Sequence, residues 1–199
     1  MNKEDILNEV RNLEWPIEFK EKLVVGDINS NVGITTLWTF PDMVYDTLEK
    51  EKYAVIGNYY DRQNGISPLL RNCLANPNLR YIFILGSDKS GSKEVLLKFF
   101  EKGVDENHKI IDTEVTIEKE IPLEELNKLR AHVKVFDVTN EVTTDMLNDS
   151  ARITNILKPK IAQLEPLAPY DMPKPFPKPE LKVDTWASEE VALGARGKT

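Results

Sequence analysis

Cysteine and histidine are scarce in this chain of 199 residues. Cys73 is the only cysteine, which excludes an internal disulfide and a thiolate-rich metal site. The only two histidines, His108 and His132, have no second histidine or cysteine close to them in the sequence. The chain also lacks a Gly-x-Ser-x-Gly elbow and a Gly-x-Gly-x-x-Gly fingerprint. We therefore expect no metal site, no serine-hydrolase triad and no dinucleotide fingerprint site.

Positive charge is in deficit and long apolar runs are missing. The 26 Lys and Arg are scattered among 33 Asp and Glu, giving a net charge of -7. Such a surface repels nucleic-acid phosphates, so we expect no nucleic-acid partner. No apolar run approaches about 18 residues, so we expect no membrane span. Residues 1–5 lack the basic, apolar start of a signal peptide, which favours a cytoplasmic protein.

What the chain does contain is a regular alternation of apolar strand patterns and amphipathic helix patterns. A Trp-Pro pair ends the first helix, and later prolines and glycines mark other boundaries. This alternation predicts an α/β fold, Rossmann-like, with a mostly parallel sheet and helices on both faces. We expect strands at 22–25, 32–39, 53–60, 81–85, 109–111 and 133–138, and helices at 4–14, 41–50, 65–75, 92–102 and 122–132.

The C-terminal part is rich in proline. Seven of the 12 prolines lie between Pro159 and Pro179, which predicts an extended, semi-rigid connector outside the sheet. We therefore expect that deletion of residues 166–199 leaves the melting temperature nearly unchanged. The expected organisation is an N-terminal helix (1–14), a Rossmann-like domain (15–157), a Pro-rich linker (158–182) and the start of a downstream module or a docked tail (183–199).

The glycine-rich stretch Gly86–Lys93 follows an apolar strand and opens a helix. Free backbone N–H groups and the helix dipole attract anions at such a point, and Ser90 or Ser92 is suited to cap the helix. The stretch resembles a phosphate-binding P-loop, but serine precedes lysine, which turns the lysine about 100° away. The alternative is a glycine-rich turn that only reverses the chain.

Polar residues also follow the preceding strands. Because parallel strands end at the same edge, the stretch Gly57–Gly65 should face Gly86–Lys93 across a crevice, with Thr35–Trp38 nearby. We expect Trp38 itself to pack in the core, Cys73 to be an inert buried thiol, and His132 to be structural. The predicted ligand-binding residues are Thr35, Thr36, Gly57, Asn58, Tyr59, Arg62, Gly86, Ser87, Asp88, Ser90, Gly91 and Ser92.

Several short motifs occur in order between residues 15 and 140: Trp15-Pro16, Val25-Gly26-Asp27-x-x-Ser30-x-Val32-x-x-Thr35-Thr36-Leu37, Asn76-Pro77-Asn78-x-Arg80-Tyr81-Ile82-Phe83-Ile84-Leu85-Gly86, Gly103-Val104-Asp105 and Ile121-Pro122. This ordered set resembles the A subunit of tetrahydromethanopterin S-methyltransferase. The resemblance implies a Rossmann-like domain that carries a corrinoid at the carboxyl ends of the strands, with a loop histidine as the lower cobalt ligand. The corresponding stretch here reads Ser90-Gly91-Ser92, without a histidine, so no catalytic or cobalt-ligating residue is carried over.

The loop Gly57–Gly65, the Ser90-Gly91-Ser92 variant and the stretch Asn107–Ile111 resemble a second branch, in which a domain similar to this methyltransferase subunit precedes a thymidylate synthase module. The linker and the stretches Trp186–Glu190 and Arg196–Thr199 resemble the entry into such a module. That resemblance implies a ligand-binding accessory domain in pterin-dependent one-carbon transfer, incomplete as an enzyme alone. It also implies a small-molecule ligand, with a reduced pterin as the candidate cofactor, and a downstream thymidylate synthase-like partner. Two alternative functions remain open: a corrinoid-binding subunit of a methyltransferase, and a structural or oligomerisation module that has lost its ligand. A homo-oligomer is a further expected partner state.

Overall fold

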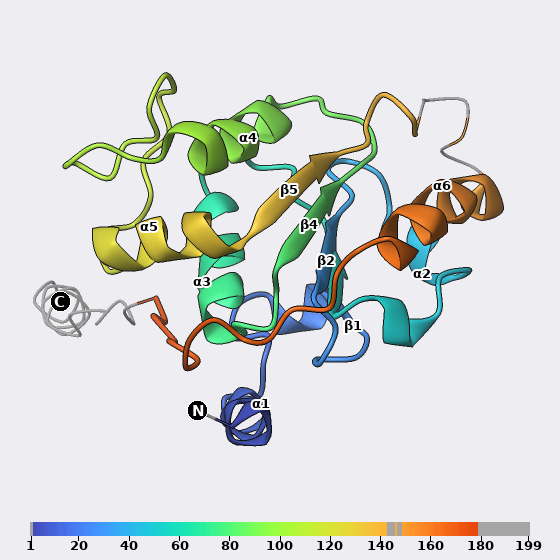
Figure 1. Ribbon diagram of the computed structural model, residues 1–199. Coiled ribbons are helices and arrows are strands. Elements are labelled where there is room, and N and C mark those ends of the chain that lie inside the picture. Colours follow the sequence, from blue (N-terminus) through green and yellow to red (C-terminus); the bar gives the residue numbers. More distant parts are fainter. Residues whose placement is uncertain (1, 143–145, 147–148, 179–199) are drawn as a thin grey trace, which may run out of the picture.

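A computed structural model describes residues 2–142, 146 and 149–178 of the chain (Figure 1). At its centre lies a five-stranded sheet in the order β1-β3-β2-β4-β5, in which β1 alone runs antiparallel to its neighbour. The mostly parallel sheet predicted from the alternation of patterns is thus confirmed. Its strands are β1 (Val24–Val25), β2 (Val32–Thr35), β3 (Val55–Gly57), β4 (Tyr81–Ile84) and β5 (Lys134–Asp137).

The described part of the chain forms six α-helices and two short 3-10 turns. The helices are α1 (Lys3–Asn12), α2 (Asp42–Tyr45), α3 (Ile66–Ala75), α4 (Ser92–Lys102), α5 (Leu123–His132) and α6 (Ser150–Ala162), and the turns are Lys20–Lys22 and Lys50–Lys52. Helix α2 is shorter than the predicted helix 41–50. Residues 109–111 form two isolated bridges instead of the predicted strand.

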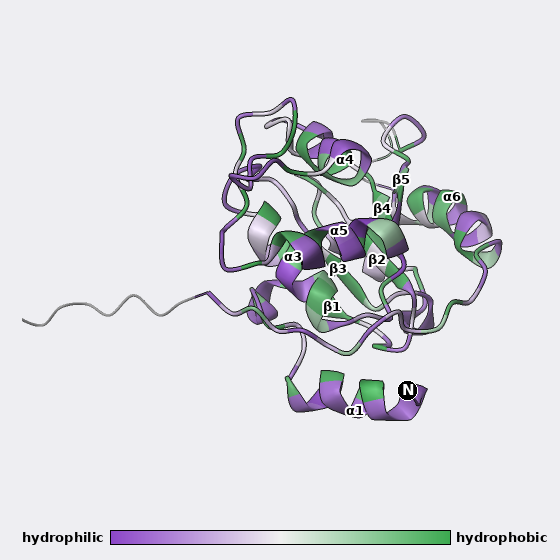
Figure 2. Cartoon of the chain, turned by 60° about the vertical axis from the view of Figure 1, so that its left-hand side comes forward, coloured by the Kyte–Doolittle hydropathy of each residue, from purple (hydrophilic) through white to green (hydrophobic). Residues whose placement is uncertain are grey.

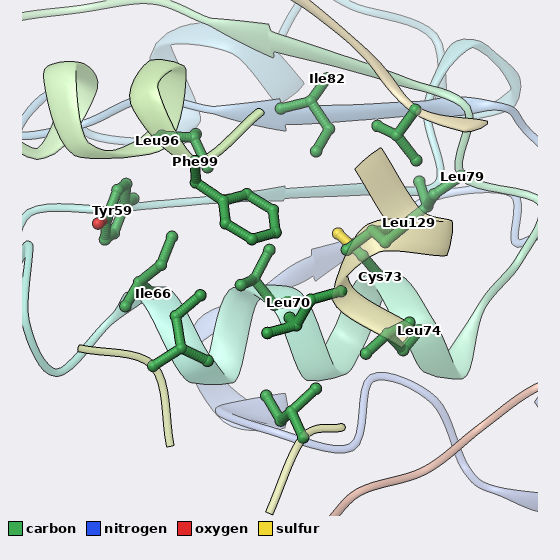
Figure 3. Packing of buried hydrophobic residues seen from close by; sticks show 14 of the residues in the cluster. Tyr59, Ile66, Leu70, Cys73, Leu74, Leu79, Ile82, Leu96, Phe99 and Leu129 are labelled. Atoms are coloured by element: carbon green, nitrogen blue, oxygen red, sulfur yellow. The ribbon is translucent and has the colours of Figure 1, made fainter. Parts of the chain in front are cut away.

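Helices cover both faces of the sheet, as expected. Side chains alternate along β4, so Ile82 and Ile84 pack towards α3, α4 and α5, whereas Tyr81 and Phe83 pack towards α2 and α6. Figure 1 shows these two groups of helices on opposite sides of the strands, and Figure 3 shows the apolar packing around α3. Helix α1 lies beyond these two groups of helices in Figures 1 and 2, and its Val10 belongs to the same buried apolar cluster as the residues of α3.

Helix α6 is a feature that the sequence analysis missed. The expected domain boundary at residue 158 falls inside it, because the helix continues through Pro159 to Ala162. Proline in a helix interior removes one backbone hydrogen bond, but it does not prevent a helix whose apolar face is already buried. Ile153 and Leu157 supply that face, and both are fully buried.

Residues 163–178, which we call the C-terminal strap, are extended and packed on the body of the protein. The side chain of Asn31 pairs with the backbone of Leu167 at 3.0 and 2.9 Å, and the N–H of Lys174 donates to the carbonyl of Leu74 at 3.0 Å. The strap lies outside the sheet, as predicted, but it is no free connector over these residues. A neutral effect of deleting residues 166–199 does not fit these contacts.

The predicted start of a downstream module, residues 183–199, lies outside the described residues and stays a prediction. Within the described part of the chain, no helix is both long enough and apolar enough to span a lipid bilayer.

Candidate ligand site at the carboxyl edge of the sheet

The loops that follow β2, β3 and β4 meet at one edge of the sheet. These strands are parallel, and β2 stands between β3 and β4, so the connection leaving β2 goes to one side and the connection leaving β3 crosses to the other. Ligands of open α/β sheets bind outside the carboxyl ends of the strands at such a reversal. The predicted residues are therefore brought to a single region of the molecule.

Asn58 joins the loops after β3 and β2. Its side-chain Nδ2 donates to Oγ1 of Thr36 at 3.1 Å and to the carbonyls of Leu37 and Thr39 at 2.8 and 2.7 Å. Oγ1 of Thr36 donates in turn to the carbonyl of Thr39 at 2.6 Å. Thr36 and Asn58 are thus close together, as predicted. Their hydrogen-bond donors are bonded to other groups of the protein.

The loops after β2 and β4 are joined directly as well. The N–H of Trp38 donates to the carbonyl of Ser87, and the N–H of Ser87 donates to Oγ1 of Thr39, both at 3.1 Å. Gly86 has φ +91°, and a Cβ there would lie 2.5 Å from that same Oγ1. Between β2 and β4 the expected crevice is therefore filled by the protein's own groups.

The carboxylate of Asp88 occupies the N-terminus of α4. Its Oδ1 accepts the N–H groups of Ser90, Gly91 and Ser92 at 3.2, 3.0 and 3.2 Å, and its Oδ2 accepts that of Lys93 at 3.1 Å. The prediction that these N–H groups are free to bind an anion, and that a serine caps the helix, is therefore wrong. Asp88 was predicted to contact the ligand, whereas here it takes the place of an anionic group.

Trp38 lies at the rim of the edge, and the prediction that it packs in the core is wrong. Its side chain is 44% exposed, and Nε1 donates to Oγ of Ser90 at 3.2 Å. The ring of Tyr60 lies 5.3 Å from the indole, and Nζ of Lys89 lies 6.0 Å from it. The hydrogen bond and the short polar loop hold the indole outward, where its face meets solvent.

Asp61 and Arg62 do not pair with each other, which was the simplest alternative for these residues. Asp61 accepts the N–H groups of Gln63 and Asn64 at 3.1 and 2.9 Å. The backbone bond from Asn64 is the main cause that lowers the pKa of Asp61. The guanidinium of Arg62 is exposed beside Gly91, at the mouth of the loop region.

Two neighbouring hollows with shared lining residues lie on the α3 side of the edge. The inner hollow, of about 100 Å³, lies between β2, β3 and α3, and the outer hollow, of about 170 Å³, opens beside the loop after β3. Both are lined by Phe19, Leu23, Asn58 and Gly65. Of the predicted ligand residues, Thr35, Gly57 and Asn58 line the inner hollow, and Asn58 and Tyr59 line the outer one.

Phe19 and Leu23 were not predicted as site residues. They come from the segment before β1, which carries no motif. The sequence did contain a signal of the hollow at other positions. Gly33 and Gly57 lie in apolar strand patterns, where a glycine often marks a close approach or a missing side chain.

Two titratable side chains beside the hollows are buried. Burial raises the pKa of the Cys73 thiol to about 12, as expected of an inert cysteine. Figure 3 shows this thiol among the apolar side chains that pack on α3. Burial likewise raises the pKa of Tyr59, whose hydroxyl donates to the carbonyl of Arg62 at 2.9 Å. Both groups are neutral at physiological pH.

Neither histidine belongs to the edge loops. Nε2 of His108 lies 3.0 Å from the carbonyl of Ile121, and Nδ1 of His132 lies 2.9 Å from that of Lys128. The described residues contain no group of three or more His, Cys, Asp or Glu side chains placed to hold a metal ion. A protein imidazole ligand to the cobalt of a corrinoid does not fit the residues present at this edge.

Fold and site together define an α/β protein with a mostly parallel sheet, helices on both faces and interlocked polar loops at the carboxyl edge. The model of the MtrA family, which describes the A subunit of tetrahydromethanopterin S-methyltransferase, matches residues 9–166. The chain belongs to this family.

Known members are similar at low identity. The A subunit of tetrahydromethanopterin S-methyltransferase from Methanosphaera stadtmanae is 25% identical over 131 residues, covering 63% of this chain and 51% of that protein. The A 2 form of the same protein from Methanothermobacter thermautotrophicus is 28% identical over 145 residues, covering 70% of this chain and 76% of that protein. The chain thus spans about half the length of the first relative and about three quarters of the second.

Proposed function

We propose that this chain is a ligand-binding accessory domain of a pterin-dependent methyl-transfer system, and no complete enzyme by itself. Membership in the MtrA family supports the link to methyl transfer. The relatives are named as subunits, which supports a role beside partner proteins. The ligand that we propose is a reduced pterin, a flat and polar ring system bound at the carboxyl edge.

The single observation that carries this choice is the hollow beside β3, where polar and apolar groups are combined. Thr35 and Asn58 supply neutral polar atoms, and Leu23 and Phe19 supply apolar cover. A site of this composition favours a flat uncharged ring, because ligand pockets are mostly apolar with a few placed polar groups. An anion would bind less favourably at this edge, because Asp88 already accepts the N–H groups at the start of α4.

A corrinoid-binding subunit of a methyltransferase is the alternative that the family suggests. Imidazole is a much better ligand for cobalt than a hydroxyl group, and the loop after β4 offers only serine hydroxyls. We therefore propose that any corrinoid contact of this chain is made without a bond from a protein imidazole to cobalt.

A structural or oligomerisation module is the other alternative, and one observation favours it. The loops after β2 and β4 fill the crevice between them with their own hydrogen bonds. We keep the ligand-binding role because the hollows beside β3 remain open. The thymidylate synthase-like partner rests on the resemblance of residues 186–199, which lie outside the described residues.

Titration of the purified chain tests these alternatives. We would titrate 6-methyltetrahydropterin, hydroxocobalamin, dUMP and inorganic phosphate by calorimetry, and follow the emission of Trp38 against a Trp38→Phe variant. We expect the pterin to bind, and we expect dUMP and phosphate not to bind. Absence of pterin binding would favour the structural module. A cobalamin complex with an imidazole-ligated visible spectrum, abolished by His108→Ala or His132→Ala, would overturn the assignment.

A further inference from the structure

The inner hollow lies where two diagonally related positions on one face of adjacent strands, Gly33 and Gly57, lack side chains. In the register of β2 and β3, Gly33 is paired with Val55 and Thr35 with Gly57. Alternation along β2 places Gly33 and Thr35 on the face that packs against α3. Without a side chain at Gly33, α3 leaves about 100 Å³ open beside the strand, whereas the place of a side chain at Gly57 is taken by Leu23.

One buried polar atom beside this space has no partner. Thr35 is 4% exposed, and its Oγ1 makes no hydrogen bond within the described part of the chain. A buried hydroxyl without a partner is costly and therefore rare in folded proteins. Asn58 lines the same hollow, and its Nδ2 is committed to the loop after β2. Thr35 Oγ1 is thus positioned to bond a polar atom of a ligand.

Residues 19–23, which we call the flap, cover the mouth of both hollows. Phe19 has φ +52° and is 48% exposed, although it lines both hollows. Leu23 lies directly over Gly57, where it occupies the place that a Cβ would take. The flap is anchored at its base, where Oδ1 of Asn72 accepts the N–H groups of Ile17 and Glu18 at 2.9 and 3.0 Å.

We propose that the two hollows form one binding pocket for a flat heteroaromatic ring system, closed by the flap. One ring lies in the inner hollow with a polar atom on Oγ1 of Thr35, and the remainder extends into the outer hollow beside Asn58. An apolar cavity of about 150 Å³ accommodates benzene. The inner hollow of about 100 Å³ therefore accommodates one ring only when the flap moves outward. The inference rests on the proposed function only for the choice of a pterin as the first probe.

The single cysteine supplies a reporter inside the pocket. Cys73 lines the inner hollow and is buried, so a thiol reagent reaches it only when the flap or the helix moves. We would measure the rate of Cys73 modification by 5,5′-dithiobis(2-nitrobenzoate) in the wild-type chain. The probes are 6-methyltetrahydropterin, under anaerobic conditions, and indole, a flat bicycle without the polar groups of a pterin. A saturating ligand in the pocket should slow modification about tenfold or more, because it holds the flap closed.

Substitutions within the pocket separate a ligand site from a packing defect. A Cβ added at Gly33 would lie 3.4 Å from Leu79 and 3.7 Å from Val55, so Gly33→Ala fits the fold while filling the hollow. We expect Gly33→Ala to weaken probe binding about tenfold. Thr35→Val removes the hydroxyl at nearly constant volume and should weaken pterin binding about fivefold, whereas Thr35→Ser should retain it.

The outcomes distinguish this inference from the proposed function. Protection of Cys73 by the pterin that needs about fivefold more ligand in Thr35→Val, and an unchanged concentration in Thr35→Ser, supports both. Protection by indole alone supports the pocket and counts against a pterin ligand. Pterin binding seen by calorimetry that neither protects Cys73 nor responds to Gly33→Ala or Thr35→Val overturns the pocket and leaves the proposed function standing. If neither probe binds, both proposals are wrong.

Discussion

The imidazole of His132 stacks on the ring of Tyr170, with centroids 4.7 Å apart and planes inclined by 9°. His132 closes α5, and Tyr170 lies in the C-terminal strap. The guanidinium of Arg80 lies 5.6 Å from the same ring and donates to the carbonyl of Ala168 at 2.7 Å. The strap is therefore bound to the body by stacking, charge and backbone hydrogen bonds together.

Shortening the chain within the strap should destabilise the protein. A chain ending at residue 165 loses the Tyr170 stack and the bonds of Leu167 and Lys174. We expect a loss of about 2–4 kcal/mol in the free energy of unfolding, or roughly 5–15 °C in melting temperature for a chain of this length. Calorimetry of this chain beside one ending at residue 178 measures the difference. Equal melting temperatures would show that the strap contributes nothing.

Asp171 should make stability depend on pH at the acid end. Burial opposes its ionisation, but hydrogen bonds from Lys128 and Lys174 outweigh this and lower its pKa to about 2. Because the folded pKa lies below the ordinary value of 3.8, its contribution is present above about pH 4 and is lost as the pH falls through 2. We expect Asp171→Asn to cost about 2 kcal/mol at pH 7 and almost nothing near pH 2.

Urea titrations at several pH values test this prediction for Asp171. Glu165→Gln is the matched control, because its side chain is exposed in the same segment. A cost for Asp171→Asn that stays constant between pH 7 and pH 2 would contradict the assigned ion pairs.

Removal of the Asp88 carboxylate should expose an anion site. In Asp88→Ala the N–H groups of Gly91, Ser92 and Lys93 lose their acceptor, which should cost about 1–2 kcal/mol. Phosphate should then bind at the freed helix terminus and restore part of the stability. Thermal melts of the variant and the wild-type chain at increasing phosphate concentrations measure this stabilisation. If the wild-type chain is stabilised as much as the variant, the terminus is already open to anions.

Two adjacent threonines should respond in opposite directions to the same substitution. Thr35 and Thr36 are both buried, but Oγ1 of Thr36 bonds to Thr39 and Asn58 whereas that of Thr35 has no partner in the described part of the chain. We expect Thr35→Val to raise the free energy of unfolding by about 1 kcal/mol and Thr36→Val to lower it by about 1–3 kcal/mol. Chemical denaturation of both variants and the wild-type chain measures these changes in the free energy of unfolding. Equal losses would show that the Thr35 hydroxyl is satisfied.

Local sequence patterns were sufficient to predict the elements that are determined by the spacing of their own apolar residues. The apolar run of β4 and the spacing of α3 and α4 were sufficient to place them, and the burial of Cys73 followed from its position on the apolar face of α3. These features depend on the periodicity of apolar residues and on the immediate neighbours in the chain. The parallel direction of most strands followed from their alternation with helices, whereas the order of the strands was not predicted.

Most of the remaining features depend on partners that are distant in sequence. The capping of α4 is an exception, since Asp88 lies only a few residues before the N–H groups that it accepts, but the exposed position of Trp38 involves a bond to Ser90 in another loop. Helix α6 continues through Pro159 because the sheet offers it an apolar face. Phe19 and Leu23 enter the site only through contacts across the fold. Except for Asp88, which is a capping residue type placed just before α4, none of these outcomes has a signal in the neighbouring residues.

One turn of α3 collects the contacts of both ends of the described chain. Asn72 holds residues 17 and 18, Cys73 lines the inner hollow, and the carbonyl of Leu74 accepts the N–H of Lys174. These are consecutive residues, so the N-terminal segment and the C-terminal strap are anchored on the same turn of α3, one through the Asn72 side chain and the other through the Leu74 carbonyl. Through this one turn, the N-terminal segment and the strap are therefore coupled to each other and to the wall of the inner hollow.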